Sequence, residues 1–232
     1  GVMEKVWLKS YPPGVPAEID ISEFNSVGDV LARSVRLYGP QPAYICMDKS
    51  ITYDELDRLS TQFAGFLQGE LGLPQGARVA IMMPNVLQYP IAAFGALRAG
   101  YTVVNVNPLY TPRELEHQLR DAGARAIVVL ENFAHSLAHV IAATSIDTVI
   151  TTQVGDLLPR VKGLLVNAVV KHVKKQVPPW TLPGAVPFRR VLAAGKREAL
   201  DDVALTRDDL AFLHYTGGTT GVAKGAMLTH GN

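Results

Sequence analysis

The chain has 232 residues, of which 48% are hydrophobic and 19% are charged, and its formal net charge at pH 7 is +1. This composition is typical of a globular protein with apolar residues for one large core or two modest ones, and the charge balance gives no reason to expect a nucleic-acid partner. The single cysteine, Cys46, cannot form an internal disulfide, and no apolar stretch is long enough to span a membrane, so we expect a cytoplasmic protein.

An arm and three helices are predicted from local sequence signals. Residues 1–21 are rich in proline and predict an extended arm over the surface. Helix-capping patterns begin at Ser26, Thr52 and Thr111, each with an acidic residue three positions later. Each pattern predicts a helix of roughly three to four turns after the cap.

A fourth helix is predicted between Met83 and Gly100. Its start is ambiguous, because either Asn85 caps it and Pro90 kinks it, or the helix begins at Pro90. Its end is better defined, with Arg98 in the last turn and Gly100 directly after it.

Short apolar runs of strand length alternate with these helices. The runs are residues 43–46, 78–83, 102–106, 126–130 and 148–151. This alternation predicts an α/β fold with a mainly parallel sheet flanked by helices. Ligands in such folds gather at the carboxyl ends of the strands.

Residues 157–187 differ in character from the rest of the chain. Apolar residues recur at helical spacing over residues 161–168, and no acid occurs between Asp156 and Glu198. The basic residues of this segment are Arg160, Lys162, Lys171, Lys174 and Lys175. Such an amphipathic helix either lies at an anionic membrane surface, receives an acidic partner, or is a solvated helix packed on the core by its apolar face. The following prolines predict a linker up to residue 187.

The candidate site is a loop rich in glycine and threonine near the end of the chain. Its proposed phosphate-binding residues are Tyr215, Thr216, Gly217, Gly218, Thr219, Thr220, Gly221 and Lys224. Glycines let backbone N–H groups converge on an anion, threonine hydroxyls add donors, and a lysine adds a mobile positive charge. The apolar runs on either side read as strands, so the loop would connect strands and cradle a triphosphate.

Other interpretations of this loop compete with a phosphate cradle. A plain glycine-rich hairpin turn stays open. A Walker A loop is excluded because Lys224 is followed by Gly225 rather than by serine or threonine. A nucleophile elbow would need a downstream acid, and none follows Gly221. His214, directly before the loop, either contributes to the site or fills the strand.

Two other groups of side chains are expected to be structural. Glu131, His135 and His139 share one helix face and could ligate a metal, but a polar helix face is the favoured interpretation, so no metal site is predicted. Cys46 lies in an apolar run and is expected to be a small buried residue rather than a nucleophile.

Three motifs in order resemble the adenylate-forming superfamily, which includes acyl-CoA synthetases, luciferases and adenylation domains of peptide synthetases. They are residues 51–56, residues 97–101 running on to Asn107 and Pro108, and the loop 215–225. The resemblance covers essentially the whole chain. One departure is Ala223, where this loop commonly has proline before the lysine.

Within that superfamily, residues 83–90, residues 105–118 and the Ala223-Lys224-Gly225 variant are similar to bacterial long-chain fatty acid–CoA ligases. The resemblance implies the N-terminal portion of an AMP-binding domain over residues 1–232. It implies ATP and Mg²⁺ as cofactors, coenzyme A and a fatty acid as substrates, and a peripheral position at the inner face of the cytoplasmic membrane. A homodimer is compatible with it.

The resemblance also implies where the chemistry lies. The loop residues from Tyr215 to Lys224 would hold the β- and γ-phosphates while the fatty acid carboxylate attacks the α-phosphate. No catalytic residue is expected within residues 1–232, and this stretch is expected to be inactive alone. The alternatives are another adenylate-forming ligase, for medium-chain or aryl acids, or a non-catalytic nucleotide- or lipid-binding module.

Overall fold

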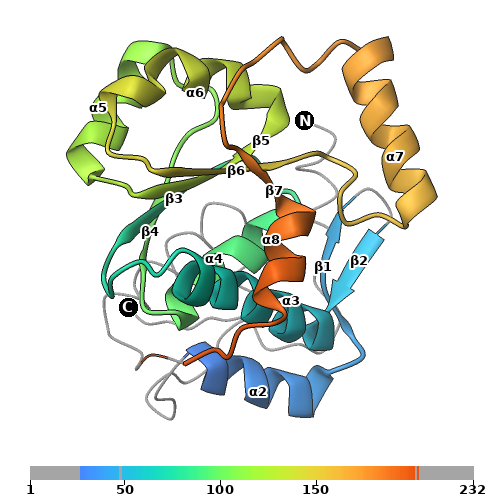
Figure 1. Cartoon of the computed structure of the whole chain (residues 1–232). Helices are drawn as coiled ribbons and strands as arrows, with labels where there is room; N and C mark the ends of the chain where they lie inside the picture. The colour runs from blue at the N-terminus through green and yellow to red at the C-terminus, as the bar shows by residue number, and fades with distance from the viewer. Residues whose placement is uncertain (1–26, 47–48, 202, 204–232) are drawn as a thin grey trace.

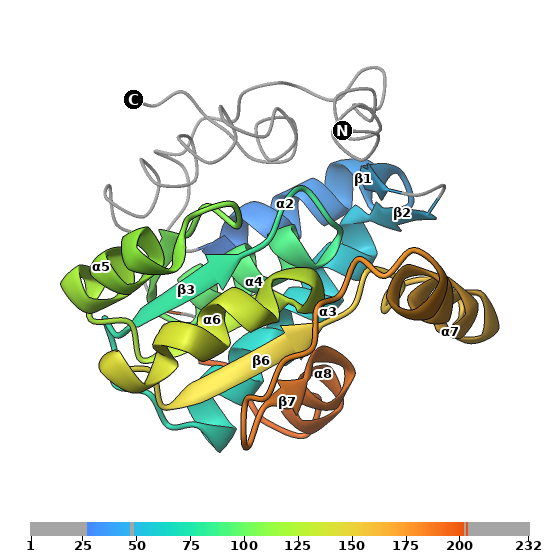
Figure 2. The ribbon, with the colours of Figure 1, turned by 90° about the horizontal axis from the view of Figure 1, so that it is seen from above.

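The structure is a computed structural model that describes residues 27–46, 49–201 and 203. This part of the chain contains a five-stranded sheet with helices on both faces, and a separate two-stranded sheet beside it (Figure 1). The expected α/β architecture is therefore confirmed. Figure 2 shows the same layers from above.

Within the described residues the predicted strands and helices are present, and three further elements, at residues 49–52, 186–187 and 188–195, were not predicted. The helices are α2 (Val27–Tyr38), α3 (Tyr53–Gly65), α4 (Gln88–Arg98), α5 (Pro112–Ala122), α6 (Ala134–Val140), α7 (Arg160–Ala168) and α8 (Phe188–Gly195). The short helical turns are η2 (Phe66–Glu70), η3 (Glu131–Phe133), η4 (Ile141–Ala143) and η5 (Val169–Val173). The strands are β1 (Pro42–Cys46), β2 (Lys49–Thr52), β3 (Arg78–Met82), β4 (Thr102–Asn105), β5 (Ala126–Leu130), β6 (Thr148–Thr152) and β7 (Val186–Pro187).

The larger sheet is parallel, with the strand order β4-β3-β5-β6-β7. The connection after β3 leads to β4 on one side, whereas the connection after β5 leads to β6 on the other side. Adjacent strands whose connections diverge in this way form a switch point, where open α/β sheets bind ligands. In this chain the switch point lies at the carboxyl ends of β3 and β5.

One predicted strand lies outside the parallel sheet. The run at residues 43–46 forms β1, which pairs antiparallel with β2, and β2 was not predicted from the sequence. Periodicity identifies an extended segment but not its partner, because pairing depends on contacts with other parts of the chain.

Alternating side chains of the parallel sheet build two cores, one on each face. Val79 and Ile81 of β3 face the core that contains α3, α4 and α8. Ala80 and Met82 of the same strand face the core that contains α5 and α6. This alternation is the two-residue period of a strand. Because both faces of the sheet are buried, the strands appear in the sequence as continuous apolar runs.

Local hydrogen bonds explain where two helices begin. At α3, the Glu55 N–H donates to Thr52 Oγ1 at 3.1 Å and the Thr52 N–H donates to Glu55 Oε1 at 3.3 Å. At α5, Thr111 and Glu114 make the same reciprocal pair at 3.2 and 3.1 Å. Two of the three predicted capping patterns are therefore confirmed, and the third, at Ser26, lies outside the described residues.

The ambiguity at Pro90 is resolved in favour of neither alternative. Helix α4 begins at Gln88, which places Pro90 at its third position, and every residue of the helix is buried. A proline in the first turn interrupts no intrahelical hydrogen bond, because those N–H groups have no carbonyl partner within the helix. Gly100 follows the helix with φ 93°, in agreement with the predicted end.

Candidate functional site

Glu131 directly follows the carboxyl end of β5, at the switch point of the sheet. Glu131 as a whole residue is only 4% exposed. Its Oε1 atom accepts hydrogen bonds from Lys171 Nζ at 3.3 Å and from Trp180 Nε1 at 3.2 Å. The carboxylate therefore binds the segment that follows α7 to the sheet, and both contacts engage the same oxygen.

A second polar cluster follows the carboxyl end of β6. Gln88 Nε2 donates to Thr152 Oγ1 and to the Gln153 carbonyl, both at 2.8 Å, and so joins α4 to this loop. The Asp156 carboxylate accepts from Thr152 Oγ1 at 3.0 Å, from the Gln153 N–H at 2.9 Å and from Asn167 Nδ2 at 3.3 Å. The cluster shapes the loop that leads into α7.

Burial raises the pKa of the Asp156 carboxyl above its ordinary value. The hydrogen bonds from Gln153 and Thr152, the charge of Arg189 and the hydrogen bond from Asn167 oppose this effect and lower the pKa in part. The acceptor capacity of Asp156 is occupied by these neighbours, so we assign it a structural role.

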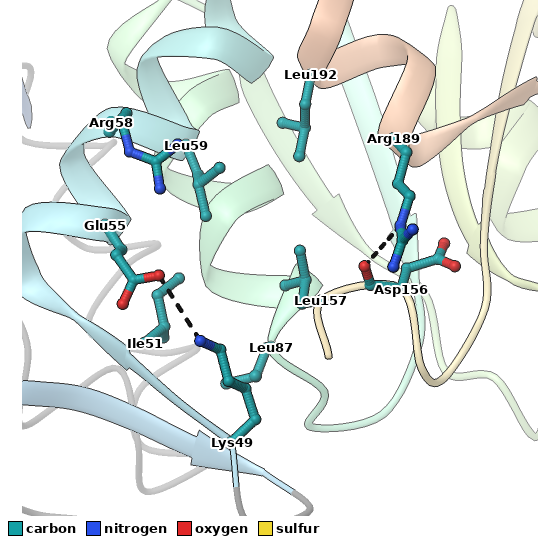
Figure 3. Close-up of a pocket in the computed structure, with 10 residues that line it drawn as sticks. All are labelled: Lys49, Ile51, Glu55, Arg58, Leu59, Leu87, Asp156, Leu157, Arg189 and Leu192. Atoms are coloured by element: carbon teal, nitrogen blue, oxygen red, sulfur yellow. Dashed lines mark hydrogen bonds and ion pairs between the residues drawn. The ribbon is translucent and has the colours of Figure 1, made fainter. Parts of the chain in front are cut away.

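A cavity of about 270 Å³ lies between β2, α3, α8 and the loops that follow β3 and β6 (Figure 3). Its apolar lining residues are Ile51, Leu59, Leu87, Leu157 and Leu192. Its charged lining residues are Lys49, Glu55, Arg58, Asp156 and Arg189. Lys49 Nζ lies 3.9 Å from Glu55 Oε2, and Arg189 Nε donates to the Asp156 carbonyl at 2.8 Å. The cavity combines an apolar floor with a charged rim, which suits binding rather than covalent chemistry.

The loop predicted to hold phosphate lies outside the described residues, from Tyr215 through Thr216, Gly217, Gly218, Thr219, Thr220 and Gly221 to Lys224. His214 and the flanking strands lie outside them too, as does the arm at residues 1–21. Their roles stay predictions.

The expectation of one polar helix face at Glu131, His135 and His139 is wrong for Glu131, which lies in η3 and is buried, whereas His139 of α6 is exposed. Glu131 is engaged as described above, and His135 Nε2 lies 3.4 Å from Ser136 Oγ. Over residues 27–46, 49–201 and 203 there is no group of three or more His, Cys, Asp or Glu side chains that could hold a metal ion. Cys46 is 4% exposed, and burial raises the pKa of its thiol to about 11, so its thiolate fraction at neutral pH is very small.

Comparison with known proteins identifies the family. Residues 31–232 match the family described as AMP-binding enzyme. The chain belongs to the AMP-binding enzyme family. Over 230 residues it is 55% identical to the long-chain-fatty-acid–CoA ligases of Escherichia coli O157:H7 and Haemophilus influenzae, which covers 99% of this chain and 41% of each relative.

The fold agrees with that family. The solved structure of the anthranilate CoA ligase AuaEII in complex with anthranoyl-AMP is similar, with a TM-score of 0.62 at 18% identity over 82% of this chain and 32% of that chain. At this level of identity the likeness concerns the fold alone. This AMP-binding enzyme chain spans about two fifths of the length of the curated relatives it matches.

Two of the three motifs that suggested the AMP-binding enzyme family have structural roles. Residues 51–56 contain the capping box that starts α3. In the motif 97–101, the Arg98 guanidinium is buried and donates to Asp57 Oδ1 at 2.9 Å and to Thr61 Oγ1 at 2.8 Å. One motif starts α3 and the other fastens α4 to it, whereas the loop at 215–225 is the motif predicted to bind a ligand.

The sequence left open whether the apolar face of helix α7 is buried or exposed. The helix itself was predicted, but its apolar residues do not pack on the described core: Val161 is 80% exposed, Leu164 60% and Leu165 64%. The alternative of a helix packed by its apolar face is therefore wrong for the described part of the chain. No helix within the described residues is long and apolar enough to cross a membrane.

Proposed function

We propose that the full-length protein is an ATP-dependent long-chain fatty acid–CoA ligase. The observation that carries this proposal is the 55% identity, over 99% of the chain, to relatives named long-chain-fatty-acid–CoA ligases. A carboxylate is a poor electrophile, so its oxygen first attacks the α-phosphate of ATP and pyrophosphate leaves. The sulfur of coenzyme A then attacks the acyl carbon of the acyl-adenylate, AMP leaves, and the thiol proton is released.

The described residues would supply positioning rather than chemistry in this reaction. Buried α4 and its hydrogen bonds to the β6 loop fix the carboxyl edge of the sheet, where the remaining parts of the site would assemble. We propose that Mg²⁺ enters the site bound to the phosphates of ATP.

We further propose that the loop from Tyr215 to Lys224 holds the β- and γ-phosphates and stabilises the charge of the leaving pyrophosphate. Lys224→Ala in the full-length enzyme is expected to lower kcat/KM for ATP by at least about tenfold, with fatty acid binding unchanged. The measurement is pyrophosphate release at varied ATP concentration. Lys196→Ala, at an exposed lysine of the described region, is the matched control. ATP kinetics equal to those of the unaltered enzyme would remove Lys224 from the mechanism.

The test of the whole function is acyl-CoA formation by the full-length protein with fatty acids of graded length and with aryl acids such as benzoate. We expect the highest kcat/KM with long chains. A clear preference for medium-chain or aryl acids would replace this proposal with a different adenylate-forming ligase. Residues 1–232 alone are expected to form no acyl-CoA, and turnover by that purified stretch, free of host enzyme, would contradict this.

We place the enzyme in the cytoplasm, as a peripheral protein at the inner face of the membrane. The absence of acidic residues between Asp156 and Glu198 and the exposed apolar face of α7 support this location. A homodimer is part of the proposal, and sedimentation of the full-length protein at several concentrations tests it.

A further inference from the structure

The outer face of α7 carries three large apolar side chains in one stripe. Val161, Leu164 and Leu165 are all more than half exposed. Since successive residues of an α-helix are separated by about 100°, these three positions fall within an arc of about 100°. Ala168, one turn further along the same arc, is also exposed. Both views of the fold show α7 at the periphery, apart from the helices that cover the sheet (Figures 1 and 2).

The opposite face of α7 holds the helix to the protein. Gly163 approaches the backbone of Gly155 so closely that a Cβ at either position would clash with the other's carbonyl oxygen. Asn167 Oδ1 accepts from the Gly155 N–H at 2.7 Å, and Asn167 Nδ2 donates to Gln153 Oε1 at 3.0 Å. Just beyond the helix, Lys171 contacts buried Glu131. These contacts fix the rotation of α7, so the apolar stripe points outward.

Positive charges border this stripe. Arg160 and Lys162 are exposed and lie about 100° to either side of Val161 on the helix surface. Lys174 and Lys175 follow at the end of the segment and are exposed as well. No acidic residue occurs anywhere between Asp156 and Glu198. A partner for this face must therefore present negative charge beside an apolar interior.

We propose that α7 lies flat in the interface of an anionic lipid bilayer, with Val161, Leu164 and Leu165 among the acyl chains and with Arg160 and Lys162 at the headgroup phosphates. A bilayer is favoured because it offers apolar material directly below a layer of negative charge, which matches the stripe and its borders. The proposal rests on the proposed function, since it names the surface by which the peripheral enzyme meets the membrane.

Vesicle sedimentation of the full-length protein tests the proposal. The probes are phosphatidylcholine vesicles with and without phosphatidylglycerol, at low and high salt. We expect binding that requires phosphatidylglycerol and weakens with salt. Leu164→Glu/Leu165→Glu is expected to weaken binding at least about tenfold, because two inserted side chains become charged. Leu109→Glu, a matched change at a residue that is 80% exposed elsewhere, is expected to change nothing.

A second pair of variants separates local charge from general charge. Arg160→Gln/Lys162→Gln is expected to weaken binding to the anionic vesicles about tenfold or more, since each cation near the surface contributes roughly fivefold. Lys196→Gln/Arg197→Gln removes two exposed cations from the same acid-free region but not from α7. Equal losses in both pairs would overturn the assignment to α7.

A dye on α7 reports what covers the stripe. Leu165→Cys labelled with an environment-sensitive dye is expected to shift its emission to the blue only when anionic vesicles are added, with the labelled parent protein as background. A dye already shielded in the vesicle-free protein would overturn the proposal, because another part of the chain or a second copy would then cover the stripe. Sedimentation at varied concentration distinguishes those two occupants.

The vesicle measurements need neither ATP nor coenzyme A, so they are independent of turnover. Acyl-CoA formation from albumin-delivered fatty acid is measured in parallel with the same proteins. Vesicle binding through α7 without acyl-CoA formation would contradict the proposed function but not this surface. Turnover without vesicle binding would contradict the surface alone.

Discussion

The contact between Glu131 and Lys171 yields a prediction about which partner is more costly to remove. Glu131 has a side chain only 6% exposed, whereas that of Lys171 is 44% exposed. Lys171→Met leaves a buried carboxylate that loses the hydrogen bond from Lys171 and keeps the one from Trp180 Nε1. Glu131→Gln instead leaves a lysine that can extend into water, and the new amide oxygen still accepts from Trp180. We therefore expect Lys171→Met to be the more destabilising change.

The geometry sets the magnitude. At 3.3 Å and an effective dielectric constant of about 20, the attraction is roughly 5 kcal/mol before the desolvation cost of Glu131 is subtracted. Removing one partner of a fully buried pair costs about 3–5 kcal/mol, and the exposure of Lys171 reduces this because water can reach the site. We expect a loss of about 2 kcal/mol in the free energy of unfolding for Lys171→Met, and less than about 1 kcal/mol for Glu131→Gln.

Equilibrium urea unfolding of the full-length protein at neutral pH measures both values. Lys174→Met is the control, since it removes an exposed lysine from the same segment and is expected to have no effect. A cost of Glu131→Gln equal to that of Lys171→Met would refute this prediction, because the loss would then come from the broken ion pair itself and not from an unpaired buried carboxylate.

Two further predictions follow from shifted pKa values. Burial raises the pKa of Cys46 from 9.0 to about 11, so the native thiol should react with a thiol reagent at pH 8 only after unfolding, and the free energy of unfolding should fall as pH rises from 9 towards 11. Cys46→Ala should reduce this alkaline loss in urea unfolding, and the raised pKa of buried Tyr101 should account for part of what remains. Hydrogen bonds from the Thr111 backbone and then its side chain lower the pKa of Glu114. The support that Glu114 gives to α5 is thus present above its unfolded pKa and is lost as pH falls through the folded pKa. Thr111→Ala keeps the backbone N–H that donates to Glu114 and should raise the pKa of Glu114 only in part in an NMR titration. The lost side-chain cap should cost about 1 kcal/mol in the free energy of unfolding, and an unchanged free energy of unfolding would contradict the capping box.

The family motifs illustrate how far local sequence signals reach. The patterns at Thr52 and Thr111 predicted helix starts because a capping box needs atoms only three residues apart. The same signals could not show that Arg98 is buried against α3, since its partners lie about forty positions earlier in the chain. Strand β7 was not predicted, because two residues that include Pro187 carry no periodicity, and pairing with β6 alone makes them a strand.

The sequence by itself determined the α/β class, the starts of α3 and α5 and four of the five strands of the parallel sheet, since these depend on periodicity and on hydrogen bonds between near neighbours. Only the tertiary structure decided that β1 pairs with β2 and that the apolar stripe of α7 faces outward. A helix has the same amphipathic pattern whether its apolar face is buried or exposed. The contacts of Gly163 and Asn167 with the β6 loop settle its orientation, and they join residues that no local pattern brings together.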